Sequence, residues 1–123
     1  MPVEPGTVYL APPDYHLLLE NDSTLALSVD EPVNFSRPSI DVLFESAADV
    51  FGAGLLGIIL TGASRDGASG LRAIRAAGGA TVVQEPHDAK VPFMTEAAIR
   101  ESPVDFVLPL DGIAALLRTL DHA

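Results

Sequence analysis

The sequence feature that most constrains the fold is the stretch 55–70, LLGIILTGASRDGASG. It opens with an unbroken apolar run at 55–60, breaks into small residues, and then resumes as a helical pattern. An apolar run of this length between turn signals predicts a strand that is buried on both faces. A glycine-rich turn leading from such a strand into a helix is where an open α/β sheet usually keeps its chemistry. The stretch therefore predicts a strand–turn–helix unit with a candidate site in the turn.

The same order of elements continues along the second half of the chain. A helix is predicted from residue 37, with Pro38 in its first turn, where the missing N–H costs nothing. Gly52 and Gly54 are predicted to end this helix. Strands are then predicted at 55–61, 80–84 and 104–108, and helices at 67–77, at 95–101 with Thr95 as cap, and from Asp111 as cap onward. This alternation predicts an α/β fold with a mostly parallel sheet covered by helices.

The first part of the chain has a different pattern. Residues 7–11, TVYLA, are predicted to form a strand after a loop that contains Pro2, Pro5 and Gly6. Residues 16–20 and 25–29 are predicted to pair as a small antiparallel ribbon, because 21–23 is typical of a hairpin turn.

Composition excludes several classes of function. The chain has 123 residues, enough for one domain, and a formal net charge of −10. That balance argues against a nucleic-acid or anionic-membrane partner, because phosphate binding needs clustered Lys and Arg. No apolar run reaches the roughly 18 residues that span a bilayer, so no direct membrane insertion is expected. Cysteine is absent, which excludes a disulfide framework or a thiolate nucleophile and fits a cytoplasmic location.

Asp66 is the first candidate site residue, and two interpretations of it stand side by side. Asp beside Gly at a strand-to-helix turn is often only a helix N-cap. Alternatively, the carboxylate orients a histidine and stabilises the imidazolium, as the acid of a hydrolytic triad does.

The rest of this turn fails two known motifs. Gly62 and Gly67 have the spacing of a P-loop, but Ala68 stands where the lysine should be. Ser64 is not in a G-x-S-x-G elbow, because Asp66 takes the place of the second glycine. No metal-ligand spacing is present either. We therefore predict no cofactor and no metal.

Three histidines and one arginine complete the candidates. His16 is interpreted as structural and His122 as an idle residue of the tail. His87 is interpreted as a solvated loop residue, although its loop follows a core strand; a new site formed by Ser64 and His87 is a further hypothesis. Arg37 either forms a surface ion pair, anchors the ribbon, or faces a substrate at a helix N-terminus.

Four segments, in order along the chain, resemble one known family. They are PGTVYLAP and DYHL at 5–12 and 14–17, RPSIDVLF at 37–44, LTG and DGA with Gly70 at 60–70, and Met94 with AAI at 97–99 and VLPL at 107–110. Together they resemble the carboxyl-terminal catalytic domain of the CheB-type chemotaxis receptor methylesterases.

This resemblance implies a doubly wound α/β domain with a Ser-His-Asp triad. The family hydrolyses methyl esters of glutamyl side chains on chemoreceptors, and many members also deamidate receptor glutamines. Asp66 matches the triad acid by its place in the T-G-x-x-x-D-G loop. The resemblance also implies that the serine and the histidine lie upstream of residue 3. Residues 1–123 are therefore expected to be an N-terminally truncated, partial catalytic domain without activity of its own.

The chain departs from the family pattern at four positions, which bear on catalysis rather than on the fold. They are Ser36 for histidine, Ala63 for methionine, Ser64 for glycine and Thr95 for proline.

The expected partner is a methyl-accepting chemotaxis receptor. A sheet without its first strands would keep an uncovered edge and face, so a homo-oligomer or a complementing segment is expected to cover it. The alternative to the enzyme is a non-catalytic CheB-like interaction module in a signalling complex.

Overall fold

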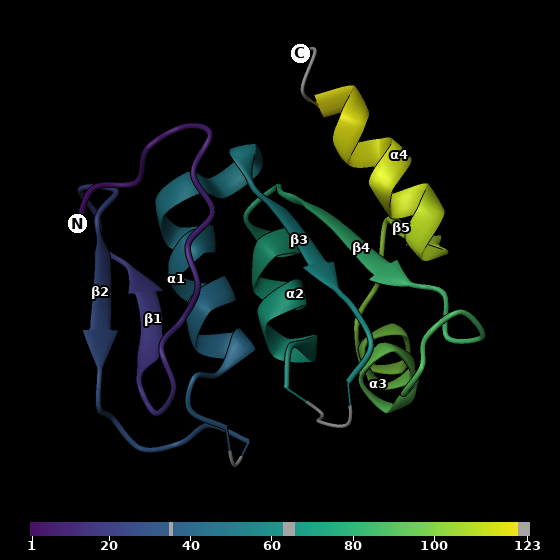
Figure 1. Ribbon diagram of the computed structural model, residues 1–123, viewed down its shortest axis with the longest axis horizontal. Helices are drawn as coiled ribbons and strands as arrows, with labels where there is room; N and C mark the ends of the chain where they lie inside the picture. The colour runs from purple at the N-terminus through teal and green to yellow at the C-terminus, as the bar shows by residue number, and fades with distance from the viewer. Residues whose placement is uncertain (35, 63–65, 121–123) are drawn as a thin grey trace.

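The computed structural model describes residues 1–34, 36–62 and 66–120, and it contains a parallel sheet. Among these residues the sheet has three strands, in the order β3 (Leu56–Ile59), β4 (Ala80–Gln84) and β5 (Phe106–Leu108). Leu56 pairs with Ala80, and Gln84 pairs with Leu108. A helix follows each strand (Figure 1), and the helices after β3 and β4 are the crossover connections that parallel strands require. The predicted α/β fold with a parallel sheet is confirmed.

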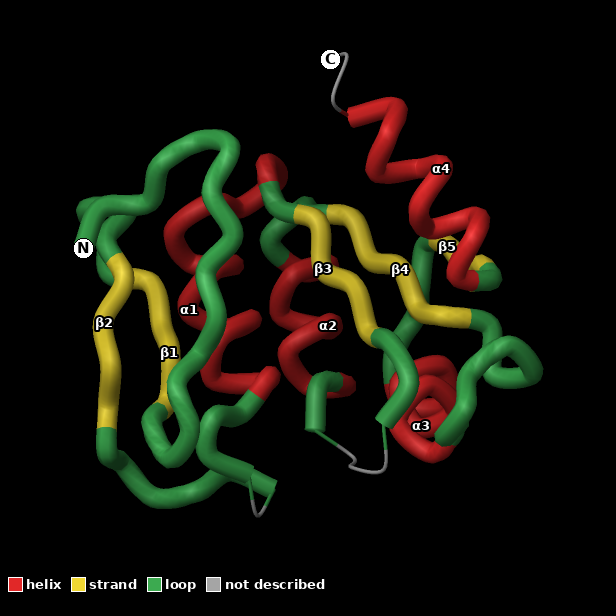
Figure 2. Tube along the Cα trace, viewed as in Figure 1, coloured by secondary structure: helices red, strands yellow, loops and turns green. Residues whose placement is uncertain are grey.

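Three of the helices pack against this sheet, and the first helix packs mainly against the second. Their bounds are α1 (Ile40–Phe51), followed by the short 3-10 turn η1 (Gly52–Gly54), then α2 (Ala68–Ala76), α3 (Phe93–Glu101) and α4 (Leu110–Leu120). Figures 1 and 2 show α1 and α2 side by side, with α4 at the end of the molecule away from the N-terminal ribbon. The close pairing of α1 with α2 brings their N-termini to the same end of the fold.

A small antiparallel ribbon precedes the parallel sheet, as predicted. It consists of β1 (His16–Leu19) and β2 (Leu25–Ser28), with Leu19 opposite Leu25. The ribbon packs on α1, where the Ser46 hydroxyl accepts the N–H of Leu19 at 2.9 Å. The ribbon is therefore fixed to the same helix whose N-terminus lines the candidate site.

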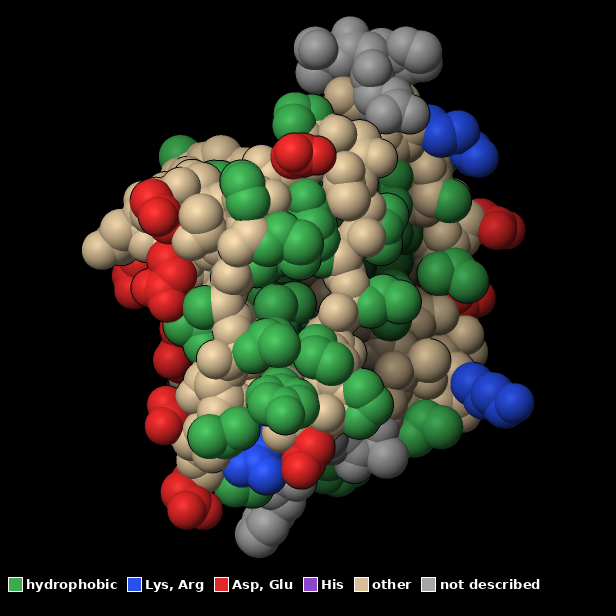
Figure 3. Space-filling model, turned by 60° about the vertical axis from the view of Figure 1, so that its left-hand side comes forward, with side chains coloured by type: hydrophobic (Ala, Val, Ile, Leu, Met, Phe, Trp, Pro, Cys, Tyr) green, Lys and Arg blue, Asp and Glu red, His purple; other side chains and the backbone are tan. Residues whose placement is uncertain are grey.

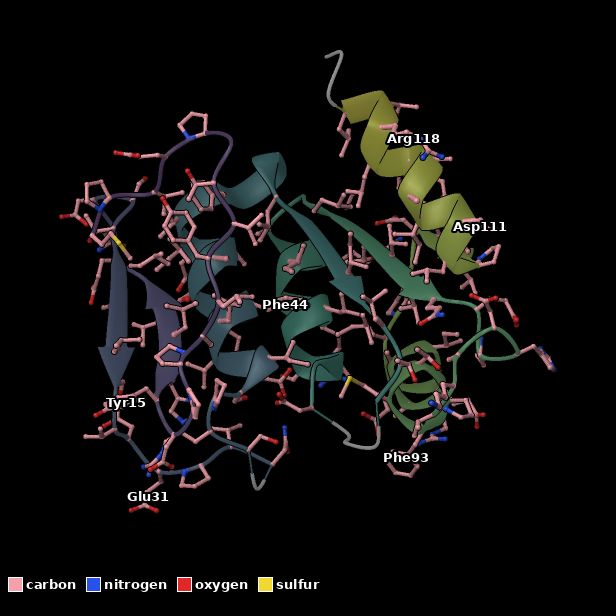
Figure 4. All side chains as sticks on the ribbon, in the orientation of Figure 1. Tyr15, Glu31, Phe44, Phe93, Asp111 and Arg118 are labelled. Atoms are coloured by element: carbon pink, nitrogen blue, oxygen red, sulfur yellow. The ribbon has the colours of Figure 1, made fainter. Side chains whose placement is uncertain are left out.

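The hydrophobic core lies between the sheet and the helices. Its buried cluster joins strand and helix residues, namely Ile59, Leu71, Val83 and Ala98, and the half-buried residues around it are Ile40, Phe44, Met94 and Val104. Phe44 lies at the centre of the molecule between α1 and α2 (Figure 4). Burial of apolar surface, which contributes about 25 cal/mol per Å², is the main free-energy term that holds α2 and α3 on the sheet.

Residues 7–11 do not form the strand that the sequence predicts. They run as an extended loop past α1, and Val8 and Leu10 are 87% and 86% exposed. Their apolar alternation favours a strand, but a strand also requires a neighbour to accept its backbone hydrogen bonds. No described strand pairs with this segment, so the local preference alone does not produce a strand.

Three predicted helix starts are also wrong in detail. Pro38 lies before α1, in a cis peptide bond with Arg37, and Ser39 is the N-cap. Thr95 is inside α3, which begins at Phe93, and its hydroxyl donates to the carbonyl of Pro92 at 2.9 Å. Asp111 is the second residue of α4 rather than its cap. The observed starts differ from the predicted ones by one to three residues, because the caps that set a helix start depend on contacts that the local sequence does not reveal.

The helices found within the described ranges are too short or too polar to cross a membrane.

Gly79 offers a test of the packing between η1 and β4. A Cβ on Gly79 would lie 2.8 Å from the carbonyl oxygen of Leu55 and 3.2 Å from that of Gly52. Because these are backbone atoms, Gly79→Ala should lower the free energy of unfolding by about 1–3 kcal/mol in urea denaturation. Gly54→Ala is the matched control, since its Cβ would meet nothing within 4 Å, and should stay within about 0.5 kcal/mol of the parent. Equal losses would contradict this packing.

Candidate functional site

Asp66 lies between β3 and α2, at the carboxyl end of a core strand, and is 2% exposed. Its Oδ1 accepts the Ser39 hydroxyl at 2.8 Å and the N–H of Asp41 at 3.3 Å. Its Oδ2 accepts the N–H of Ile40. These donors form the N-terminus of α1, where the helix dipole favours a negative charge. Asp66 is therefore a buried carboxylate that caps a helix distant in the sequence.

Asp41, in the first turn of α1, performs the reciprocal role for α2. Its Oδ1 accepts the N–H of Gly67 at 3.0 Å and that of Gly70 at 2.6 Å. Asp66 thus caps α1, and Asp41 caps α2. We call this arrangement the crossed caps of Asp41 and Asp66.

Asn34 bridges the two carboxylates. Its Nδ2 donates to Oδ2 of Asp41 at 2.9 Å and to Oδ1 of Asp66 at 3.2 Å. Its backbone has φ 52°, a left-handed conformation that asparagine tolerates better than most residues. One amide group therefore separates two like charges that would otherwise repel each other.

The environment of Asp41 disfavours its charged form. Burial raises the pKa of Asp41 above its ordinary value of 3.8, and the neighbouring Asp66 charge raises it further. The N–H groups of Gly70 and Gly67 and the Asn34 amide oppose this rise. A perturbed carboxyl beside a second carboxylate is a feature that functional sites share with structural ion clusters.

The residue types of a hydrolytic triad meet near Asp66, but in the wrong order. The Nδ1 of His16 accepts the backbone N–H of Ser39 at 3.2 Å, and its Nε2 lies 2.9 Å from the carbonyl of Glu31. The Ser39 hydroxyl donates directly to Asp66. A triad instead requires the histidine between the serine and the acid. His16 and Ser39 are 1% and 2% exposed, so they serve the structure, as predicted for His16.

Arg37 anchors the ribbon, one of the roles considered for it. Its Nη2 pairs with Asp14 at 2.9 Å, and its Nη1 donates to the carbonyls of Val29 and Asp30 at 3.0 and 3.3 Å. The guanidinium therefore ties the start of α1 to the end of β2.

His87 does not join the site. The side chain of His87 is 96% exposed and pairs with Glu85 at 2.9 Å, a contact that raises the pKa of His87. Ser64 and His122, together with the departure at Ala63, lie outside the described residues. Within the part of the chain that is described, no group of three His, Asp or Glu side chains is placed to hold a metal ion.

Comparison with known proteins identifies the family of this chain. The family model described as CheB methylesterase matches residues 1–117. The chain belongs to the CheB methylesterase family. The predicted family resemblance is thereby confirmed.

Individual relatives agree with this assignment. A protein of Leptospira interrogans is 53% identical over 120 residues, which cover 98% of this chain and 62% of that protein. The protein-glutamate methylesterase/protein-glutamine glutaminase of Nitrosospira multiformis is 42% identical over 116 residues, 94% of this chain and 33% of that protein.

The fold agrees as well. The crystal structure of the Thermotoga maritima CheB methylesterase catalytic domain superimposes with a TM-score of 0.91 at 31% identity, over 96% of this chain and 64% of that domain. The chain thus spans a little under two thirds of both the Leptospira relative and the solved domain.

Asp41 is the site residue that sequence reasoning missed. It occurs in the segment RPSIDVLF, but nothing local assigns it a partner, since Gly67 and Gly70 follow 26 and 29 residues later. The available signal was the position of Asp41 in the first turn of α1, where an acid is common. That signal does not show that the start of α2 lies beside it.

Removing Asp66 tests its capping role. Asp66→Ala leaves the Ser39 hydroxyl and two backbone N–H groups without an acceptor in a buried site, so the free energy of unfolding should fall by about 1–3 kcal/mol. Asp49→Ala, at an exposed acid on the same helix, is the matched control and should change it by less than about 0.5 kcal/mol. If the two variants unfold at the same urea concentration, Asp66 does not cap α1.

The raised pKa of Asp41 predicts a pH dependence of stability. Below 3.8 the carboxyl is protonated in both the folded and unfolded states, so it imposes no penalty. As pH rises past 3.8, the unfolded state ionises first, and stability is lost until the folded carboxyl ionises too. Asp41→Asn removes this term, so the stability of the variant relative to the parent should rise with pH in urea titrations. A difference that stays flat with pH would contradict a raised pKa.

Proposed function

We propose that this chain forms part of a protein-glutamate methylesterase site, with Asp66 as the acid of its triad. The observation that carries this proposal is a buried carboxylate held by the N-terminus of α1 at the carboxyl end of β3. A triad acid has to be buried and rigidly oriented, because it fixes the tautomer and position of a histidine.

In the proposed reaction, a serine and a histidine come from a segment beyond the stretch described. The serine oxygen attacks the ester carbonyl of a glutamyl side chain on a chemotaxis receptor, while the histidine takes the serine proton. Asp66 orients the imidazole and stabilises the imidazolium. Collapse of the tetrahedral intermediate breaks the ester C–O bond, and the imidazolium gives its proton to the leaving oxygen, so methanol is released. Water, deprotonated by the histidine, then attacks the acyl-enzyme and leaves a glutamate carboxylate on the receptor and a serine hydroxyl on the enzyme. With a glutamine side chain, the same sequence releases ammonia.

An exposed apolar face supports the proposal that a further segment, or a second copy of the chain, covers this one. A groove of about 460 Å³ lies between the N-terminal loop and the ribbon, lined in part by Tyr9, Leu10 and Leu27. Figure 3 shows apolar side chains gathered on this side of the molecule, with acidic side chains along one margin. Exposed apolar patches of this kind commonly mark surfaces that bind protein.

We further propose that the complete protein acts in the cytoplasm.

A non-catalytic interaction module is the second candidate. The observation that favours it is the crossed caps, because they give Asp66 a structural role that needs no histidine. The enzyme and the module differ in one respect that can be measured, namely release of methanol from a methylated receptor.

Methanol release from methylated receptor tests the proposal. The isolated chain should release none, since the described residues contain no serine–histidine pair on Asp66. Co-expression with the part of the Leptospira interrogans relative that lies outside the match should restore release.

In that complemented protein, Asp66→Asn should lower kcat by roughly 10⁴-fold, because the histidine loses its orienting charge. Asp49→Asn, on the exposed face of α1, is the control and should leave kcat unchanged. Restored release that is indifferent to Asp66→Asn would refute the role of Asp66, and an inactive complemented protein would favour the module.

A further inference from the structure

We propose that Asp41 is a positioning residue for Asp66, holding the turn that presents the Asp66 carboxylate through its bonds to Gly67 and Gly70. The importance of this turn for catalysis rests on the proposed function. The contacts themselves do not depend on it, so the two ideas can fail separately.

The residues after Asp66 are shaped to meet Asp41. Gly67 has φ 111°, a conformation that side chains rarely adopt, and in it the N–H of Gly67 reaches Oδ1 of Asp41. A Cβ on Gly70 would lie 2.6 Å from the Cβ of Phe44 and 3.1 Å from Oδ1 of Asp41. Both glycines therefore permit a contact that a larger residue would block.

The two bonds act on Asp66 through the chain. Asp66 is joined covalently to Gly67, so a carboxylate that holds the N–H of Gly67 also limits where the Asp66 backbone can move. Asp66 in turn holds α1 at Ile40, the neighbour of Asp41. Helices α1 and α2 pack directly, so a shift at either cap changes the other. Loss of Asp41 should therefore loosen contacts that Asp66 makes, as well as its own.

Two variants separate the acceptor oxygen of Asp41 from its charge. Asp41→Asn keeps an oxygen that can accept from Gly67 and Gly70 but loses the acceptor for the Asn34 amide, whereas Asp41→Ala removes both acceptors. Both variants lose the negative charge at the start of α1, so the effect of that charge on the helix cancels when they are compared. Asp49→Ala, at an exposed position of the same helix, is the control for loss of an acid from α1.

The experiment is amide hydrogen exchange, followed by NMR on the full 123-residue chain. Relative to the core amide of Val83, the amides of Gly67, Gly70 and Ile40 should exchange roughly tenfold faster in Asp41→Ala. Ile40 is the informative amide, because it donates to Asp66 and makes no bond to the Asp41 side chain. Asp41→Asn and Asp49→Ala should remain within about threefold of the parent.

Two results would overturn the proposal. One is an Ile40 amide that exchanges no faster, relative to Val83, in Asp41→Ala than in Asp41→Asn. The other is an Asp41→Asn variant as damaged as Asp41→Ala. In the complemented methylesterase, Asp41→Ala should lower kcat, whereas Asp41→Asn should keep a kcat close to that of the parent. Absence of methanol release from the complemented parent would refute the proposed function but leave the exchange result standing.

Discussion

The crossed caps of Asp41 and Asp66 are the interaction on which the rest of the structure depends. Each helix N-terminus carries backbone N–H groups that have no partner within the helix. Here each helix satisfies those of its neighbour, because the acid that caps α1 precedes α2 and the acid that caps α2 lies inside α1. The N-termini of the two helices and the candidate site are therefore fixed by one set of hydrogen bonds.

This arrangement places two acids together in a buried site, which would be costly without compensation. The positive ends of two helix dipoles, the Ser39 hydroxyl and the Asn34 amide supply that compensation. At Asp41 these donors offset the burial and the Asp66 charge only in part, since its pKa stays raised, whereas the N-terminus of α1 holds Asp66 in place before any histidine arrives. The same chemistry thus serves the stability of the fold and the task proposed for Asp66.

The sequence predicts the parallel sheet and the location of Asp66 because both follow from patterns of neighbouring residues. The apolar run at 55–60 and the small residues after it specify a buried strand and its turn. The sequence does not predict the capping role of Asp41, since the hydrogen bonds of Asp41 to Gly67 and Gly70 join residues far apart in the chain. Residues 7–11 fail as a strand for a related reason: their propensity is local, but a strand needs a partner that no local pattern reveals.

Asn34 also makes the site chemically vulnerable. Its single amide donates to both acids, so hydrolysis of that amide to a carboxylate would replace two attractive contacts by two repulsive ones. A third negative charge would then stand between Asp41 and Asp66. Slow chemical ageing at this one residue would disable the cluster without altering a single core side chain.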